Sequence, residues 1–308
     1  MGWKMSIRLW LVKRQIRKIF RPKHLWGADI ARIGDHFRDT LTGLEPKFPK
    51  TPKDAIIHNV DEDGALGDWV WAPNAEEKRV FFYIHGGGYV WGSPAAYHEF
   101  GYQLSKACKA RVFLLDYGLA PETVAPAQLH QSLAAYDYIK KNHPGARVVI
   151  GGDSAGGGLA HATTIAIRDS EREAPLASAL IAPWVDITGT SPSIKENMWK
   201  ETMLDGRALE RGGDLFRGDL ASDDPICSPL YAEQHDLPPI LMQVGQDEIL
   251  RDDSVRLAAK IEKAGGAVQL DVWPKVYHVW HRAASMVPEA RKAIKDIAEF
   301  FEPHWANE

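Results

Sequence analysis

The chain has 308 residues, of which 45% are hydrophobic and 25% are charged, the composition of an ordinary globular protein. Its formal net charge of −4 predicts no nucleic acid or other polyanion as a partner. Its only cysteines, Cys108 and Cys227, lie far apart and outside any metal-ligand spacing. They therefore predict no metal site and a reducing compartment, the cytoplasm. Strands and helices alternate to the end of the chain, which predicts one α/β domain with insertions.

The first 24 residues contain eight Lys or Arg and no acidic residue. Apolar residues recur among them at near-helical spacing: Trp3, Ile7, Trp10, Leu11, Ile16, Ile19 and Phe20. No apolar run is long enough for a signal peptide or a membrane span. We interpret residues 1–50 as an N-terminal cap segment whose helix covers an active site. The alternative is a peripheral membrane contact, in which residues 1–24 lie on an anionic membrane surface.

A glycine run follows the first strongly buried strand. Residues 55–60 and 68–71 read as two strands, and the buried strand at 79–84 leads into His85-Gly86-Gly87-Gly88-Tyr89. No helix-opening nucleotide motif follows, so phosphate binding is the weaker interpretation. Backbone N–H groups of Gly87 and Gly88, which have no Cβ in the way, predict an oxyanion hole, and His85 is expected to hold the loop.

The pentapeptide Gly152-Asp153-Ser154-Ala155-Gly156 lies between a β-branched strand at 147–150 and a helix at 159–168. Strand, tight glycine-flanked turn and helix are the context of a nucleophile elbow. The sequence therefore predicts Ser154 as the nucleophile, with the N–H of Ala155 as a third oxyanion donor. The alternative is a glycine-rich turn that only caps a helix.

The region between residues 97 and 222 divides into core and insertion. The sequence predicts helices at 97–110 and 127–141 and strands at 112–115 and 176–182. With the earlier strands and the elbow, these elements make residues 51–186 the first part of the predicted core. Residues 187–222 break this rhythm and predict a cap insertion at the face where the strands end. We expect an apolar substrate pocket here, and ordinary core packing is the alternative for each of its predicted residues: Tyr89, Trp184, Met198, Trp199, Met203 and Phe216.

The last part of the core, residues 223–308, contains the predicted base. Strands at 239–244 and 268–273 flank a helix that ends near residue 264, and a last helix spans about 283–301. A serine needs a base, and the base needs an acid that fixes its tautomer. The order serine, acid, histidine predicts His278, in the loop after the last strand, as the base. His281 is the alternative.

These motifs resemble the hormone-sensitive-lipase-like (bacterial family IV type) esterases of the α/β-hydrolase superfamily. The resemblance depends on the glycine run, the elbow, the His278 loop and two further motifs, Tyr117-x-Leu119-Ala120-Pro121-Glu122 and Asp224-Pro225-x-x-Ser228-Pro229-Leu230. It implies an α/β-hydrolase fold, with a mostly parallel central sheet flanked by helices and a helical cap. It also implies hydrolysis of short- to medium-chain carboxylic esters without a cofactor. By analogy with fold-mates it implies a homodimer through the last strand.

The triad acid follows from the same resemblance. The family's pattern Asp-x-Leu-x-Asp, aligned without a gap, falls on Glu248-Ile249-Leu250-Arg251-Asp252. This makes Glu248 the predicted acid and leaves Asp247 as the alternate acid. Neighbouring side chains at a strand end point in different directions, so only one of the two should reach His278.

Together these residues predict a serine carboxylesterase that works through an acyl-enzyme on a small ester substrate. One alternative is an amide or lactone hydrolase that uses the same triad. Another is a non-catalytic ligand-binding homologue, as the hydrolase-like gibberellin receptors illustrate, but such proteins typically lose the base and His278 is present.

Overall fold

The computed structural model describes residues 5–21, 36, 39–43 and 49–306. Its sheet has the order β1-β2-β4-β3-β5-β6-β7-β8. Strand β2 runs antiparallel to both its neighbours, β1 and β4, and the other strand pairs that the structure describes are parallel. The mostly parallel α/β sheet that the sequence predicts is therefore confirmed. The strands are β1 (Ile56–Glu62), β2 (Ala65–Trp71), β3 (Glu76–Ile84), β4 (Ala110–Leu115), β5 (Arg147–Asp153), β6 (Ser178–Ile181), β7 (Ile240–Gly245) and β8 (Val268–Trp273).

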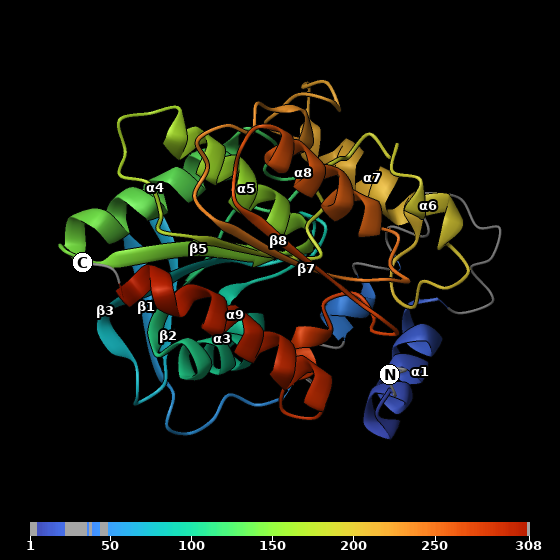
Figure 1. Cartoon of the computed structure of the whole chain (residues 1–308), viewed down its shortest axis with the longest axis horizontal. Coiled ribbons are helices and arrows are strands. Elements are labelled where there is room, and N and C mark those ends of the chain that lie inside the picture. Colours follow the sequence, from blue (N-terminus) through green and yellow to red (C-terminus); the bar gives the residue numbers. More distant parts are fainter. Residues whose placement is uncertain (1–4, 22–35, 37–38, 44–48, 307–308) are drawn as a thin grey trace.

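Helices cover both faces of the sheet (Figure 1). One face carries α4 (Ala127–Asn142), α5 (Ser154–Arg168) and α8 (Arg251–Lys263), and the other carries α3 (Pro94–Cys108) and α9 (Pro288–Ala306). The sheet separates two hydrophobic cores, the first under α4, α5 and α8 and the second under α3 and α9. Successive side chains of β3 point to opposite faces, so Phe82 packs in the first core and Phe81 and Tyr83 pack in the second. Burial on both faces fixes the end of β3, from which the glycine run starts.

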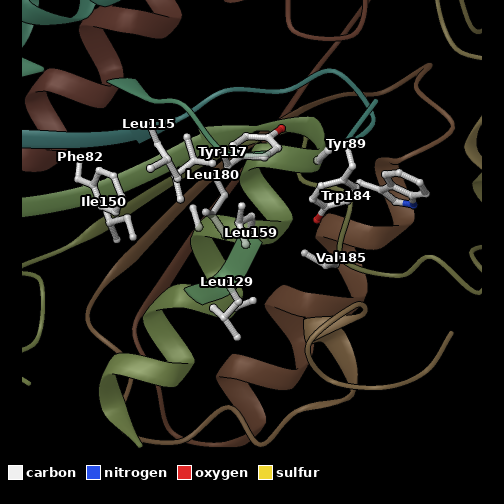
Figure 2. Packing of buried hydrophobic residues seen from close by; sticks show 14 of the residues in the cluster. Phe82, Tyr89, Leu115, Tyr117, Leu129, Ile150, Leu159, Leu180, Trp184 and Val185 are labelled. Carbon is white, nitrogen blue, oxygen red and sulfur yellow. The ribbon is translucent and has the colours of Figure 1, made fainter. Parts of the chain in front are cut away.

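Figure 2 shows part of the first core. Phe82 and Ile150 lie at one end of the labelled cluster, and Tyr89 and Trp184 lie at the other, beyond Leu159 of α5. The core is therefore continuous from the middle of the sheet to the segments that follow β3 and β6. Because protein cores are closely packed, this core holds the segments that follow β3 and β6 in fixed positions.

Three helix starts differ from the sequence prediction. Helix α5 begins at Ser154 rather than at residue 159. Helix α3 begins at Pro94 rather than at residue 97, because Ser93 caps it and accepts a hydrogen bond from the Ala96 N–H at 3.2 Å. The last helix begins at Pro288 rather than at residue 283, and residues 280–283 form a separate 3₁₀ turn, η4 (Trp280–Ala283). His281 therefore lies on η4 and not on α9.

The predicted cap segments lie at one end of the molecule (Figure 1). They contribute α1 (Ile7–Phe20), α6 (Ser193–Glu196) and α7 (Gly206–Arg217), and η3 (Pro229–Tyr231) follows them. Residues 22–35 and 44–48 of the predicted N-terminal cap lie outside the described residues. Among the helices that the structure describes, none has the length and hydropathy needed to cross a membrane. Strand β8 forms an edge of the sheet, and the homodimer through it stays a prediction.

Candidate active site

The turn between β5 and α5 holds Ser154 in a strained conformation. Ser154 has φ +54°, which non-glycine residues rarely adopt. A Cβ at Gly152 would lie 2.4 Å from the Gly156 carbonyl oxygen, and one at Gly156 would lie 2.2 Å from the Ile84 carbonyl oxygen. Both positions therefore require glycine, as the elbow motif predicts. The turn places Ser154 at the N-terminus of α5, where backbone N–H groups favour negative charge.

Asp153, the residue before the serine, connects the elbow to the glycine loop. Its buried carboxylate accepts hydrogen bonds from the Tyr83 hydroxyl at 2.8 Å, the Tyr97 hydroxyl at 2.9 Å and the Gly86 N–H at 3.1 Å. Burial raises the pKa of Asp153, although nearby Arg282 and the tyrosine hydroxyls oppose this. The sequence analysis gave Asp153 no role beyond its place in the motif. Its fixed place there was the only signal.

The glycine loop leaves two amides for a ligand. Gly87 has φ +127° and Gly88 has φ +64°, and a Cβ at Gly87 would lie 1.9 Å from the Trp91 carbonyl oxygen. The Gly86 amide is already bonded to Asp153 and Tyr97. Within the described part of the chain, no hydrogen bond leads from the Gly87 or Gly88 amide to another residue. These two amides can therefore donate to an oxyanion.

His85 is buried in the core beneath this loop. Its Nδ1 contacts the Gly86 carbonyl oxygen at 2.8 Å, and its ring stacks on Tyr117 with a centroid separation of 4.4 Å. Burial lowers the pKa of His85 to about 4, so the imidazole is neutral at pH 7. This geometry supports the predicted structural role.

His278 and Glu248 form a buried pair. Nδ1 of His278 lies 2.6 Å from Oε2 of Glu248, and the side chains are 2% and 1% exposed. The other carboxylate oxygen accepts a hydrogen bond from the Gly245 N–H at 2.6 Å, which fixes its orientation. Burial lowers the pKa of His278, but the carboxylates of Glu248, Glu201 and Asp153 together raise it by more, so the pKa lies above its ordinary value. Burial raises the pKa of Glu248, and His278 opposes this.

The two alternates for this pair point elsewhere. Asp247 is 30% exposed and lies 3.5 Å from the Lys13 ammonium of α1. His281 is fully buried, and its Nε2 contacts the Gln243 side-chain oxygen at 2.7 Å. Burial and the neighbouring His278 lower the pKa of His281 to about 3, so it is neutral. The structure therefore brings Glu248, and not Asp247, to His278.

Ser154, His278, Gly87 and Gly88 line one cavity of about 300 Å³. Its apolar wall comes largely from the predicted cap segments and the strand end after β6: Val12, Ile16 and Phe20 of α1, Leu209 and Leu215 of α7, and Met203, Leu204 and Trp184. The sequence analysis missed its polar lining residues Glu99, Arg211 and Arg282, because they come from helices and turns without a motif. The cavity suits an apolar chain with one reactive polar group.

Four predicted pocket residues do not line this cavity: Tyr89, Met198, Trp199 and Phe216. Tyr89 and Phe216 stack on each other at a centroid separation of 3.6 Å, and both are buried in the first core. Trp199 is 62% exposed and lies on a neighbouring cavity. Of the predicted pocket residues, Trp184 and Met203 reach the cavity of Ser154. The structure therefore places Tyr89 and Phe216 in the core, as the alternative describes.

Among the residues that the structure describes, no group of three His, Cys, Asp or Glu could hold a metal ion. Cys108 is buried, and burial raises the pKa of its thiol to about 12.

A family model described as the alpha/beta hydrolase fold matches residues 81–282. An acetyl-hydrolase from Streptomyces hygroscopicus is 36% identical over 234 residues, which cover 76% of this chain and 78% of that protein. An esterase from Acinetobacter venetianus is 31% identical, with 85% of this chain and 87% of the esterase covered. An ethyl acetate hydrolase from Pseudomonas putida is 30% identical, with 92% of each chain covered.

Solved structures give the same result over almost the whole chain. The esterase EstE5, soaked with p-nitrophenyl butyrate, superposes with a TM-score of 0.89 at 33% identity and covers 98% of this chain and 100% of its own. An esterase from the bacterial hormone-sensitive lipase family superposes with a TM-score of 0.88 at 32% identity, with 98% and 99% covered.

Proposed function

Because the chain belongs to the alpha/beta hydrolase fold family, in its hormone-sensitive-lipase-like branch, and is a carboxylic ester hydrolase, we propose that it is a serine esterase that acts through an acyl-enzyme. The observation that carries this proposal is the buried contact of 2.6 Å between His278 and Glu248, on the cavity that Ser154 also lines. An aligned imidazole is what a serine nucleophile needs for its activation.

The first half of the reaction acylates the enzyme. Oγ of Ser154 attacks the ester carbonyl carbon while Nε2 of His278 takes the hydroxyl proton. Glu248 holds Nδ1 and stabilises the imidazolium. The amides of Gly87, Gly88 and Ala155 donate to the oxyanion. The bond between the carbonyl carbon and the alcohol oxygen then breaks, and His278 gives its proton to the leaving alkoxide.

The second half repeats these steps with water. His278 takes a proton from water, the resulting hydroxide oxygen attacks the acyl carbon, and the amides again hold the oxyanion. The bond to Ser154 Oγ breaks, and His278 returns the proton to the serine. A carboxylic acid leaves, and the enzyme regains its starting state.

Short- to medium-chain esters are the proposed substrates. The cavity of about 300 Å³ has mainly apolar walls, and two relatives are named for acetyl and ethyl acetate hydrolysis. A cavity at the small end of the usual range for ligand sites favours small acyl groups.

Helix α1 and residues 187–222 are proposed as the cap of this site. Val12, Ile16 and Phe20 line the cavity, and Lys13 donates to the carbonyl oxygens of Lys275 at 3.2 Å and Val276 at 3.3 Å. These contacts tie α1 to the loop that carries His278. They favour the lid over the membrane contact, which remains the alternative because Ile7, Trp10 and Leu11 are exposed on the outer face.

A series of p-nitrophenyl esters from acetate to palmitate tests the proposal, with Ser154→Ala beside the wild type. Turnover of short chains that is lost in the variant supports it. A fluorophosphonate probe should add its mass to the wild type and not to Ser154→Ala. Ester turnover that survives in the folded variant would refute Ser154 as the nucleophile.

A further inference from the structure

Three side chains form a wall between the site cavity and a second cavity. Trp184, Leu204 and Leu209 each line both the cavity of Ser154 and a neighbouring cavity of about 620 Å³. All three are buried, with exposed fractions of 2%, 3% and 8%. The second cavity is therefore separated from the site by one layer of side chains.

The second cavity has a mainly apolar lining. Its apolar side chains come from the segment after β6, from α6 and the loops around it, and from the loop after β7: Ile187, Ile194, Met198, Trp199 and Ile249. Charged residues also line it: Lys195 and Glu210 are exposed to water, whereas Arg21 and Asp205 pair at 3.8 Å with side chains only 12% and 20% exposed. Its apolar walls suit an apolar chain, and its charged groups are either paired or at solvent.

The three wall residues differ in how firmly they are held. Trp184 donates its backbone N–H to the Ser154 carbonyl oxygen at 2.9 Å and its ring N–H to the Asp186 carbonyl oxygen at 3.2 Å. A Cβ added at Gly212 or Gly213 on α7 would lie 3.7 or 3.6 Å from this ring, in ordinary contact. Leu204 and Leu209 contribute only aliphatic side chains to the wall. They are therefore the part of the wall that can be removed without breaking hydrogen bonds.

We propose that Leu204 and Leu209 set the chain length at which the site is closed, and that the second cavity takes the distal end of a longer ester chain once this wall is opened. The proposal rests on the proposed function, because it extends the site of Ser154. Leu204 lies on the loop before α7 and Leu209 within α7, so the length limit is set by the segment at 187–222.

Leu215 provides a matched control. It lies on α7, as Leu209 does, and lines the cavity of Ser154, but it does not line the second cavity. Leu209→Ala therefore opens the wall, whereas Leu215→Ala only enlarges the first cavity. The test compares both variants and the wild type on p-nitrophenyl esters from acetate to palmitate and on alkyl acetates from ethyl to decyl.

Leu209→Ala should raise kcat/KM for decanoate or longer relative to acetate by about tenfold or more, since each added methylene that finds an apolar pocket gains binding energy. A rise in the p-nitrophenyl series means that the acyl chain enters the second cavity. A rise confined to the alkyl acetates means that the alcohol chain enters it. Leu204→Ala should act in the same direction, and it keeps the test decisive if Leu209→Ala fails to fold.

An unchanged length profile in both folded opening variants would overturn the proposal. So would an equal rise in Leu215→Ala, because the added volume alone would then explain it. The proposed function fails separately, through ester turnover in the wild type that does not depend on Ser154. Thermal unfolding of each variant distinguishes these results from a loss of folded protein.

Discussion

At the scale of single residues, the contrast between Glu248 and Asp247 gives the sharpest prediction. Glu248→Gln should lower kcat by about 10²–10⁴, because an amide cannot stabilise the imidazolium. Asp247→Asn should change kcat by less than about threefold, because Asp247 faces the partly exposed Lys13. Steady-state kinetics with p-nitrophenyl acetate would measure both. A larger loss in the Asp247 variant would reverse the assignment.

The same pair predicts a pH dependence. The base must be neutral in the free enzyme, so kcat/KM should rise with pH through the pKa of His278. Against the lowering by burial, Glu248 together with Glu201 and Asp153 raises that pKa above the ordinary 6.5, so the midpoint of the acid limb should lie above pH 6.5. In Glu248→Gln, burial still lowers the pKa of His278, but the main cause that raises it is gone. The acid limb of kcat/KM should therefore move to lower pH. An acid limb that does not move would separate His278 from Glu248.

At the scale of elements, the two faces of α1 fit the two roles that the sequence left open, a lid over the active site and a membrane contact. Its inner side chains line the cavity, and its outer face exposes Trp10, 47% exposed, with Arg14 over the indole ring at 5.6 Å. One helix can thus be a lid, a membrane contact or both. Variants on its two faces separate these roles.

Ile16→Glu should lower kcat/KM for a dissolved short-chain ester by about tenfold or more, because a carboxylate at the apolar wall is costly to desolvate. Trp10→Glu, the control on the outer face, should leave this value unchanged. Co-sedimentation with anionic liposomes checks the alternative. Loss of binding in Trp10→Glu, with no effect of Ile16→Glu on turnover, would identify α1 as a membrane contact rather than a lid.

Local sequence rules were sufficient for the elements of the core. The elbow, the glycine loop and the buried strands are specified by short patterns. Glycine is required at Gly152 and Gly156 by backbone contacts within the turn and with the end of β3 at Ile84. The choice of Glu248 as the partner of His278 came from the resemblance, whose acid pattern aligns on Glu248 without a gap, and the structure brings these two side chains together. These features depend on neighbours in sequence or on the order of the strands.

The residues that line the pocket were less predictable. The stacking of Tyr89 on Phe216 and the contact of Lys13 with Asp247 join segments far apart in the chain, and no local pattern encodes them. Residue type alone does not tell whether a tryptophan such as Trp199 lies on a pocket wall, in a core or on the surface. Only the packing of the segment at 187–222 decides which of these holds.

At the scale of the whole molecule, three buried histidines predict a loss of stability in acid. Burial lowers the pKa of His85 and His161 to about 4 and of His281 to about 3. Below pH 6.5 the unfolded chain binds protons that the folded chain excludes. The stability that is complete above pH 6.5 is therefore lost as the pH falls toward 4, by up to about 1.4 kcal/mol per pH unit for each histidine.

His161 isolates one share of this effect, because it lies on α5 outside the cavity, with Nε2 2.8 Å from the Gln234 side-chain oxygen. His161→Gln should flatten the fall in the free energy of unfolding between pH 6.5 and 4, while the matched change at exposed His235 should not. Asp253, whose pKa burial raises to about 7, acts in the opposite direction in every variant, so it cancels in the comparison. Urea unfolding at several pH values measures the slopes. Equal slopes in the wild type and His161→Gln would show that this imidazole does not contribute to acid unfolding.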